Sequence, residues 1–135
     1  MNDEPCLLFV GAGADRAATS DELRRLARSA LAGLGESPSA VACVATIERP
    51  GDKPAVAGLA AALGVPVRFY TAERLEQETP RLANPSEAVF RKVGCHGVAE
   101  AAALAAAGPD AALVVPKLAS AHATLAVARA ARRSA

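Results

Sequence analysis

The stretch VACVATI at residues 41–47, the helical pattern at 54–64 and VPVRFY at 65–70 decide the fold. The first run is short and apolar apart from Thr46, which is typical of a strand that is buried on both faces of a sheet. The middle segment opens at a proline, ends at a glycine and repeats apolar residues at helical spacing, at Val56, Leu59, Ala60 and Leu63. This succession of strand, helix and strand predicts an α/β domain with a parallel sheet.

The N-terminal part continues the same alternation. Residues 6–10 form a short apolar run that predicts a buried strand, and we expect residues 11–18 to be a loop. Thr19 and Glu22 have the spacing of a capping box, in which each side chain binds a free backbone amide of the first helical turn. Apolar residues then recur at helical spacing as far as Leu34, which predicts a helix.

Beyond residue 70 the predicted elements are shorter. Thr71 can cap a brief helix, and Ser86 can cap a second one that ends near Gly94. Residues 77–85 form a polar connection between these two helices. An alanine-rich helix is expected over residues 98–107. We therefore expect three helices between the third strand and the next one.

The last part of the chain contains two candidate strands. Residues 111–115 are apolar, and Pro116 is expected to end that strand. Residues 120–129 suit a helix by their alanine content and a strand by their Thr-Leu-Ala-Val run, and we favour a strand that pairs with 111–115. The elements together predict a single domain over residues 1–135, with a three-layer αβα architecture, a largely parallel sheet and an antiparallel C-terminal hairpin.

Composition excludes several classes of protein. The formal net charge is +1, and three Phe, one Tyr and no Trp leave few aromatic side chains for stacking on bases, so nucleic-acid binding is not expected. The three cysteines are scattered and no Cys-x-x-Cys pair occurs, so neither a disulfide framework nor a metal site is expected. No apolar stretch approaches the roughly 20 residues that span a bilayer, and the acidic start is unlike a signal peptide. We therefore expect a cytoplasmic protein without a membrane segment.

Candidate ligand-binding residues come from loops at the carboxyl ends of the predicted strands, where open α/β sheets bind their ligands. These loops are residues 11–20, 46–53 and 116–122, and a fourth candidate is the turn at 94–97, which precedes a helix. Exposed amides at that helix start would favour a carboxylate or a phosphate.

Gly11 and Gly13 superficially resemble the glycine-rich turn of a dinucleotide-binding site. Arg16 stands where that site needs its third glycine, and no acidic residue ends a suitable strand about 20 residues further on. The simpler interpretation is that the glycines allow a tight turn from strand to helix, so no cofactor is expected. Arg16 is either solvated or binds a substrate carboxylate through both of its terminal nitrogens.

Glu48, His96 and His122 are the candidate catalytic residues. Glu48 follows a buried strand, where partial burial can raise the pKa of a carboxyl group enough for it to act as a general base. His96 either lines a ligand pocket or is an exposed loop residue, and His122 could be the distant partner of a Cys95 nucleophile. A solvated loop position is the alternative for all three.

Three further polar residues have two interpretations each. Glu100 lies in the first turn of an otherwise apolar helix, where it either interacts with the helix dipole or faces a ligand. Lys117 and Ser120 follow a buried strand and a proline, and they are either solvated or bind the ligand. The residues alone thus predict an α/β domain with a polar cleft at one edge of its sheet.

A family resemblance rests mainly on residues 86–117. SEAV at 86–89, VG at 93–94 and GVAEAAAL at 97–104 resemble the signature of the CobE and CbiG C-terminal family of cobalamin biosynthesis. VPK at 115–117, followed by Ser120 and by TLAVAR at 124–129, is similar to the closing segment of that family. The further matches are Gly11-x-Gly13 with Arg16 and Thr19, the strand end at 45–47, and residues 63–69. The resemblance covers essentially the whole chain.

The first two loops depart from the pattern of this family. Its first loop commonly reads Gly-x-Gly-Cys-Arg-Arg-Gly, whereas this chain has Ala14, Asp15 and Ala17 in place of the cysteine, the first arginine and the last glycine. Its second loop commonly carries a lysine and then a glutamate, whereas this chain has Pro50 and Lys53. One positive charge of the first loop has therefore become negative.

The resemblance implies a role in corrin-ring assembly. It implies a corrin-type tetrapyrrole intermediate as the ligand and other cobalamin-pathway enzymes as partners. Full-length CbiG, which has additional N-terminal domains, opens a ring-A lactone of a cobalt-precorrin and releases acetaldehyde. A precorrin lactone hydrolase is therefore an alternative function, and a small interaction module without a ligand is another.

The matched positions give a set of expected substrate-binding residues. They are Gly11, Gly13, Arg16, Thr19, Thr46, Ser86, Glu87, Gly94, Gly97, Glu100, Lys117 and Ser120. The seven from Ser86 onward are expected to converge around one cleft, because helix starts and strand ends can meet at the carboxyl side of a sheet.

Overall fold

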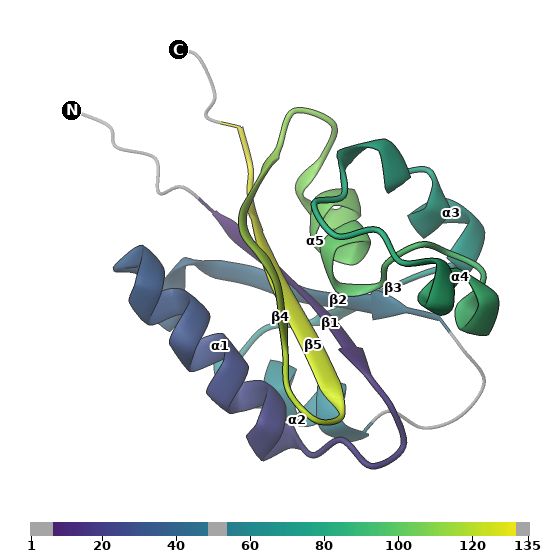
Figure 1. Ribbon diagram of the computed structural model, residues 1–135. Coiled ribbons are helices and arrows are strands. Elements are labelled where there is room, and N and C mark those ends of the chain that lie inside the picture. Colours follow the sequence, from purple (N-terminus) through teal and green to yellow (C-terminus); the bar gives the residue numbers. More distant parts are fainter. Residues whose placement is uncertain (1–6, 49–53, 132–135) are drawn as a thin grey trace.

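The structure is a computed structural model that describes residues 7–48 and 54–131, and these form three layers (Figure 1). The middle layer is a sheet with strand order β3-β2-β1-β5-β4. Its strands are β1 (Leu8–Ala14), β2 (Val41–Ile47), β3 (Val67–Tyr70), β4 (Ala112–Ala119) and β5 (Ala123–Arg129). One face is covered by α1 (Ser20–Leu34) and α2 (Pro54–Leu63), and the other by α3 (Ala72–Glu76), α4 (Glu87–Val93) and α5 (Ala99–Ala107). The predicted α/β class with three layers is confirmed.

The sheet is mixed, with its parallel part at one end. β1, β2 and β3 are mutually parallel, whereas β5 pairs antiparallel with both β1 and β4. Among the described strands, β5 alone therefore runs in the opposite direction. The prediction of an antiparallel C-terminal hairpin is confirmed, and the helical alternative for residues 120–129 is wrong.

β1 is longer than the sequence indicated, because its second half has a partner. A loop was expected from Gly11 onward, but Gly11, Ala12, Gly13 and Ala14 each pair with a residue of β5. The expectation of a tight turn at the two glycines is wrong. At Gly11 a Cβ atom would lie 1.9 Å from the carbonyl oxygen of Ala99, so the glycine is what allows α5 to lie directly on the strand.

β4 continues through Pro116, which was expected to end it. β4 is an edge strand, and its register with β5 shifts between Leu113 and Leu118. A proline lacks the amide that a central strand needs, but it is tolerated at an edge or at an irregularity of the ladder. Lys117 therefore lies within a strand and not beyond its end.

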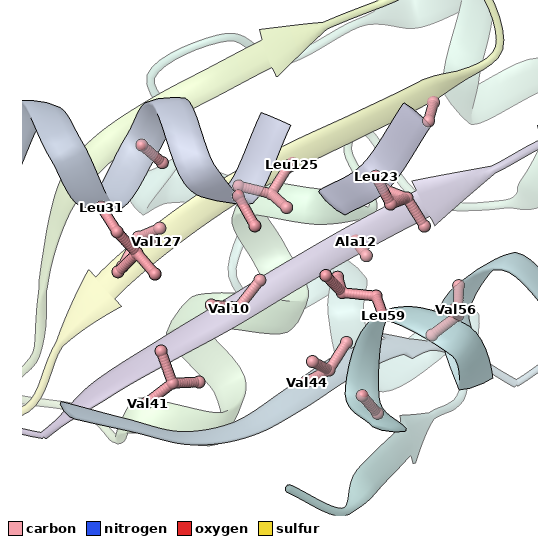
Figure 2. Packing of buried hydrophobic residues seen from close by; sticks show 14 of the residues in the cluster. Val10, Ala12, Leu23, Leu31, Val41, Val44, Val56, Leu59, Leu125 and Val127 are labelled. Atoms are coloured by element: carbon pink, nitrogen blue, oxygen red, sulfur yellow. The ribbon is translucent and has the colours of Figure 1, made fainter. Parts of the chain in front are cut away.

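The larger core lies between the sheet and the two helices α1 and α2 (Figure 2). Its labelled members come from both helices and from β1, β2 and β5: Val10, Ala12, Leu23, Leu31, Val41, Val44, Val56, Leu59, Leu125 and Val127. Leu23 and Leu31 are two turns apart on α1, as the helical spacing predicted. This core holds the sheet in place, and neither α1 nor α2 contributes a residue to the lining of the cleft described below.

The opposite layer is packed through small side chains. The buried residues of α5 are alanines apart from Leu104 and Glu100. They lie over Ala45 of β2 and Ala128 of β5, both of which are fully buried. Small residues on both sides allow a short helix to approach the sheet closely, and this fixes the start of α5 near the carboxyl ends of the strands.

Three predicted helix caps are present. The side-chain oxygens of Thr19, Thr71 and Ser86 accept hydrogen bonds from backbone amides three residues further on. Pro50 and Lys53 of the second loop lie outside the described residues. Across residues 7–48 and 54–131, no helix combines the length and the apolar character that crossing a membrane requires.

Candidate functional site

A cleft of about 320 Å³ opens at the carboxyl ends of β1, β2 and β4. Its walls are α4, the start of α5 and the turn between β4 and β5. The polar or charged side chains that line it are Asp15, Asn84, Lys92, His96, Glu100, Lys117, Ser120, His122 and Thr124. The position agrees with the general rule for ligand sites in open α/β sheets.

The structure brings some of the expected residues to this cleft and leaves others elsewhere. The lining includes Gly13, His96, Gly97, Glu100, Lys117, Ser120 and His122. It does not include Gly11, Arg16, Thr19, Thr46, Glu48, Ser86, Glu87 or Gly94. Of the seven residues that were expected to converge, four line the cleft, while the other three begin and end α4 beside it.

Several of the residues outside the cleft have structural contacts instead. Thr46 is fully buried, and its hydroxyl donates a hydrogen bond of 2.7 Å to the carbonyl oxygen of Ala12. Thr19 caps α1, and Gly11 lies under α5. The backbone amide of Glu48 donates to the carbonyl oxygen of Tyr70, and its side chain is exposed outside the cleft.

His96 is held between two carboxylates. Its Nδ1 atom lies 2.8 Å from Oε2 of Glu76, and its Nε2 atom lies 3.0 Å from Oε2 of Glu87. The ring is stacked on Phe90, with the two ring centroids 4.4 Å apart. Hydrogen bonding to Glu76 raises the pKa of His96 above its usual 6.5, and Glu87 adds to this effect against the opposing desolvation. The arrangement therefore favours an imidazolium cation at the wall of the cleft.

His122 forms a second, separate pair at the β4–β5 turn. Its Nδ1 atom lies 3.0 Å from Oδ2 of Asp15, and hydrogen bonding to that carboxylate raises the pKa of His122. The backbone amide of His122 donates to Glu22 at 2.7 Å, and the hydroxyl of Ser120 donates to the same carboxylate oxygen. Glu22, predicted as half of a capping box, thus ties the β4–β5 turn to the start of α1.

Glu100 is 3% exposed and is the buried acid of the site. Its carboxylate accepts hydrogen bonds of 2.9 Å from the backbone and side-chain amides of Asn84 and from the backbone amide of Lys117. Burial, the largest single influence, would raise the pKa of Glu100, but the Lys117 and Asn84 donors together lower it. Glu100 therefore stays ionised and joins α5 to β4 and to the segment before α4.

Positive charge and free amides face the cleft from three elements. Lys92 of α4 and Lys117 of β4 are exposed and line it. The start of α5 also lines it, and no side chain caps the first amides of that helix at Val98. Uncapped amides at a helix start carry partial positive charge and bind anions.

The interpretation of Cys95 as a nucleophile is not supported. The thiol is fully buried, burial raises its pKa, and it donates to the carbonyl oxygen of Gly97 at 3.5 Å. A nucleophilic cysteine needs an accessible thiolate. Within the described ranges, no cluster of three or more His, Cys, Asp or Glu side chains is arranged to hold a metal ion.

Sequence reasoning missed the partners that fix the charged residues of the site. Asp15, Glu76 and Asn84 lie 107, 20 and 16 positions from the residues they bind. Glu76 directly follows the short helix that was predicted to end at Leu75, and Asn84 was placed in a polar connection; at such positions no local pattern distinguishes an ion-pair partner from a solvated side chain. Only the chain topology brings these groups together.

Known proteins resemble this chain over most of its length. A family model described as the C-terminus of cobalamin synthesis protein G matches residues 8–128. Protein CobE of Sinorhizobium sp. is 47% identical over 121 residues, which are 90% of this chain and 79% of that protein. A crystal structure of CobE, from the cobalamin (vitamin B12) biosynthetic pathway, has a TM-score of 0.89 and 36% identity, and the match covers 97% of this chain and 95% of that one.

A more distant relative is a larger enzyme. The cobalt-precorrin-5A hydrolase of Priestia megaterium is 30% identical over 124 residues. The match covers 92% of this chain but 32% of the hydrolase, so this chain spans about a third of the length of that enzyme.

Proposed function

Because the chain belongs to the CbiG C-terminal family of cobalamin biosynthesis proteins, we propose that it binds a corrin-type tetrapyrrole intermediate in the cleft between α4, α5 and the β4–β5 turn. Intermediates of this type are macrocycles that carry several carboxylate side chains. A site for such a ligand needs hydrogen-bond donors and positive charge on its surface, with few free acceptors that would repel a carboxylate.

One observation carries the proposal. The carboxylates of the cleft already have hydrogen-bond partners within the protein, whereas its lysine side chains are exposed. Glu100 accepts three hydrogen bonds from amides, and Asp15 is paired with His122. Lys92 of α4, Lys117 of β4 and the uncapped start of α5 all line the cleft. A ligand carboxylate would therefore meet donors in the cleft.

The size of the cleft limits how much of the ligand it can enclose. Its volume of about 320 Å³ is at the lower end of ligand pockets, which range over roughly 300 to 1,000 Å³. We expect one edge of the macrocycle and its carboxylates to enter, while the rest lies across the rim. Other enzymes of the pathway, in the cytoplasm, would deliver and receive the ligand at this open side.

A pigment titration tests this function. Hydrogenobyrinic acid or a precorrin is added to the protein, and the absorbance of the pigment and the heat of binding are recorded. We expect the absorbance to shift on binding because the macrocycle moves from water to the protein surface. If neither an absorbance change nor heat is found across these intermediates, the proposed function is wrong.

Lys117→Ala tests whether the ligand lies in this cleft. Loss of the ammonium group should weaken binding by about 1 to 3 kcal/mol, because it leaves a ligand carboxylate without its partner in a partly desolvated site. The melting temperature should change little, because the Lys117 contact with Glu100 is made by the backbone amide. Arg25→Ala, which removes an exposed cation from α1, is the matched control and should bind as the unmodified protein does. Equal binding by both variants would place the ligand elsewhere.

The alternative is a hydrolase that acts on a precorrin lactone, and it is motivated by the identity with the cobalt-precorrin-5A hydrolase. The pairs His96–Glu76 and His122–Asp15 have the form of a histidine oriented by an acid. The pKa of both histidines is raised, however, which favours cations over general bases. Mass spectrometry of the pigment after incubation distinguishes the two functions: lactone opening adds the mass of one water, release of acetaldehyde then removes the mass of that aldehyde, and binding alone leaves the mass unchanged.

A further inference from the structure

α4 forms one wall of the cleft but is weakly anchored to the rest of the protein. None of its seven residues is buried, yet Val89, Lys92 and Val93 line the cleft. The helix begins after Asn84, which Glu100 holds in place, and it ends at Gly94 in the left-handed conformation with φ 88°. A short helix between two fixed points with few buried contacts can move as a unit.

Val93 at the end of α4 packs against the buried cluster that includes Leu75 and Cys95, and the contacts of the rest of the helix gather on His96. Glu87, in its first turn, pairs with Nε2 of His96, and Phe90, one turn later, stacks on the His96 ring. The backbone amide of Ser86 donates to the carbonyl oxygen of His96 at 2.8 Å. His96 itself is tied to α3 through Glu76, which accepts from both its ring and its backbone amide.

The hydrogen bonds of Glu76 and Glu87 depend differently on the protonation of the His96 ring. Both can be satisfied only by an imidazolium, because a neutral imidazole has a single N–H group. Glu76 accepts from Nδ1 and from the backbone amide of His96, so that side of the ring keeps its partner. The side chain of Glu87 is 75% exposed, and it loses its donor when the ring loses a proton. Deprotonation therefore removes the Glu87 contact and loosens α4, while the contact of His96 with Glu76 of α3 remains.

We propose that α4 is a lid over the cleft and that protonated His96 latches it through Glu87 and Phe90. The lid carries Lys92 and two apolar residues of the cleft wall, so the latched state is the one that offers the complete site. The consequence for ligand binding rests on the proposed function, whereas the latch is a property of the protein alone. Closing the lid over a bound macrocycle would slow its release.

The pH dependence follows from the charges that face His96. They are Glu76 of α3, Glu87 and Lys92 of α4, Glu100 of α5 and Lys117 of β4, with the pair of Asp15 and His122 across the cleft. Glu76 and Glu87 raise the pKa of His96 above its usual 6.5. The latch is therefore fully formed below pH 6.5 and is lost as the pH rises through the raised pKa.

Hydrogen exchange on the protein without ligand tests the latch. Protection factors of the amides at residues 90–94 are measured at several pH values, together with the NMR titration of the His96 ring. We expect the amides of α4 to lose protection as His96 deprotonates, while the buried amides of α5 keep theirs. Protection of α4 that does not follow the His96 titration would overturn the proposal.

Three variants separate the latch from general destabilisation. Glu87→Ala should leave α4 weakly protected at every pH, and Glu87→Gln should remove most of the pH dependence because its amide can pair with a neutral ring. Glu73→Ala, which removes an exposed acid from the neighbouring α3, should behave as the unmodified protein does. A Glu87→Ala protein with normal α4 protection would also overturn the proposal. These measurements use no pigment. A failed pigment titration would therefore not contradict the latch, and a failed hydrogen-exchange test would not contradict pigment binding.

Discussion

At the scale of single residues, Gly11 of β1 is needed because α5 lies directly against it, and not because the chain turns there. Gly11→Ala should be destabilising, because the added Cβ would lie 1.9 Å from the Ala99 carbonyl oxygen and 2.7 Å from the Ala103 amide nitrogen. Overpacking of this kind typically costs about 1 to 3 kcal/mol, and here both neighbours are backbone atoms that cannot rotate away. Denaturant unfolding monitored by circular dichroism measures the change.

Gly33→Ala is the matched control for this prediction. Gly33 lies near the end of α1, and a Cβ atom there would meet nothing within 4 Å. Since alanine is the better helix former by up to about 1 kcal/mol, this variant should be at least as stable as the unmodified protein. If Gly11→Ala were as stable as Gly33→Ala, the contact between β1 and α5 would not be as tight as described.

The residues that could be predicted from the sequence are those whose partners are close along the chain. Thr19 and Ser86 were predicted as helix caps because a cap needs only an amide three residues away. Glu22 was predicted to serve its own helix, but its carboxylate binds Ser120 and His122, about a hundred positions away. No local pattern contains that information, because it depends on where β5 returns beside β1.

At the scale of elements, Arg81 joins the segment after α3 to the end of α5. Its Nη1 atom donates to the carbonyl oxygens of Gly108, Pro109 and Ala111 at 3.2 to 3.3 Å, and Glu78 pairs with the same guanidinium. These carbonyls belong to the turn that follows α5, so the guanidinium of Arg81 fixes the path of the chain from α5 to β4.

Arg81→Ala should therefore reduce the free energy of unfolding by about 1.5 to 3 kcal/mol, the range for hydrogen bonds to a charged group. Arg81→Lys should recover little of this loss, because an ammonium group cannot reach several carbonyls in one plane. Arg74→Ala removes the other cation that pairs with Glu78 and should cost less. Equal losses for Arg74→Ala and Arg81→Ala in urea denaturation would contradict a special role for the guanidinium at the end of α5.

The type of an element could be predicted where its hydrophobic pattern agrees with its burial. The residues at which β1 and β4 end could not be predicted. The run at 41–47 is β2 with the same bounds, since it is largely buried and is apolar apart from Thr46. β1 and β4 both extend past the glycines and the proline that were expected to stop them. In both cases pairing with β5 overrides the local signal, and that pairing is a long-range property.

At the scale of the whole molecule, the ionisable pairs give stability a maximum in mildly acidic solution. Glu100 is buried, which alone would raise its pKa, but its hydrogen bonds lower it below the usual 4.5, so its contribution is present above pH 4.5 and is lost as the pH falls. The pKa values of His96 and His122 are raised, so their contributions are present below pH 6.5 and are lost as the pH rises. The melting temperature should therefore be highest between about pH 4.5 and 6.5.

Melting curves on both sides of this window measure the effect. Replacing His96 and His122 together by glutamine should flatten the alkaline side of the profile, because neither side chain titrates any longer. The acidic side should keep the part of its slope that comes from Glu100 and lose the part that comes from Asp15 and Glu76, whose histidine partners are gone. An alkaline limb as steep as before would show that other groups cause it.

The position of β1, between β2 and β5, has a consequence for how the chain folds during synthesis. Leu8 pairs with Arg129 at one end of the β1–β5 ladder and Ala14 with Ala123 at the other, so one side of the central strand finds its partner only after almost every other element has left the ribosome. Until then, β1 has an unpaired edge that can join strands of neighbouring nascent chains. Closing a loop of this length also slows folding, because its entropy must be lost before the contacts form. A truncated chain that ends before β5 should therefore aggregate rather than form a smaller version of the domain.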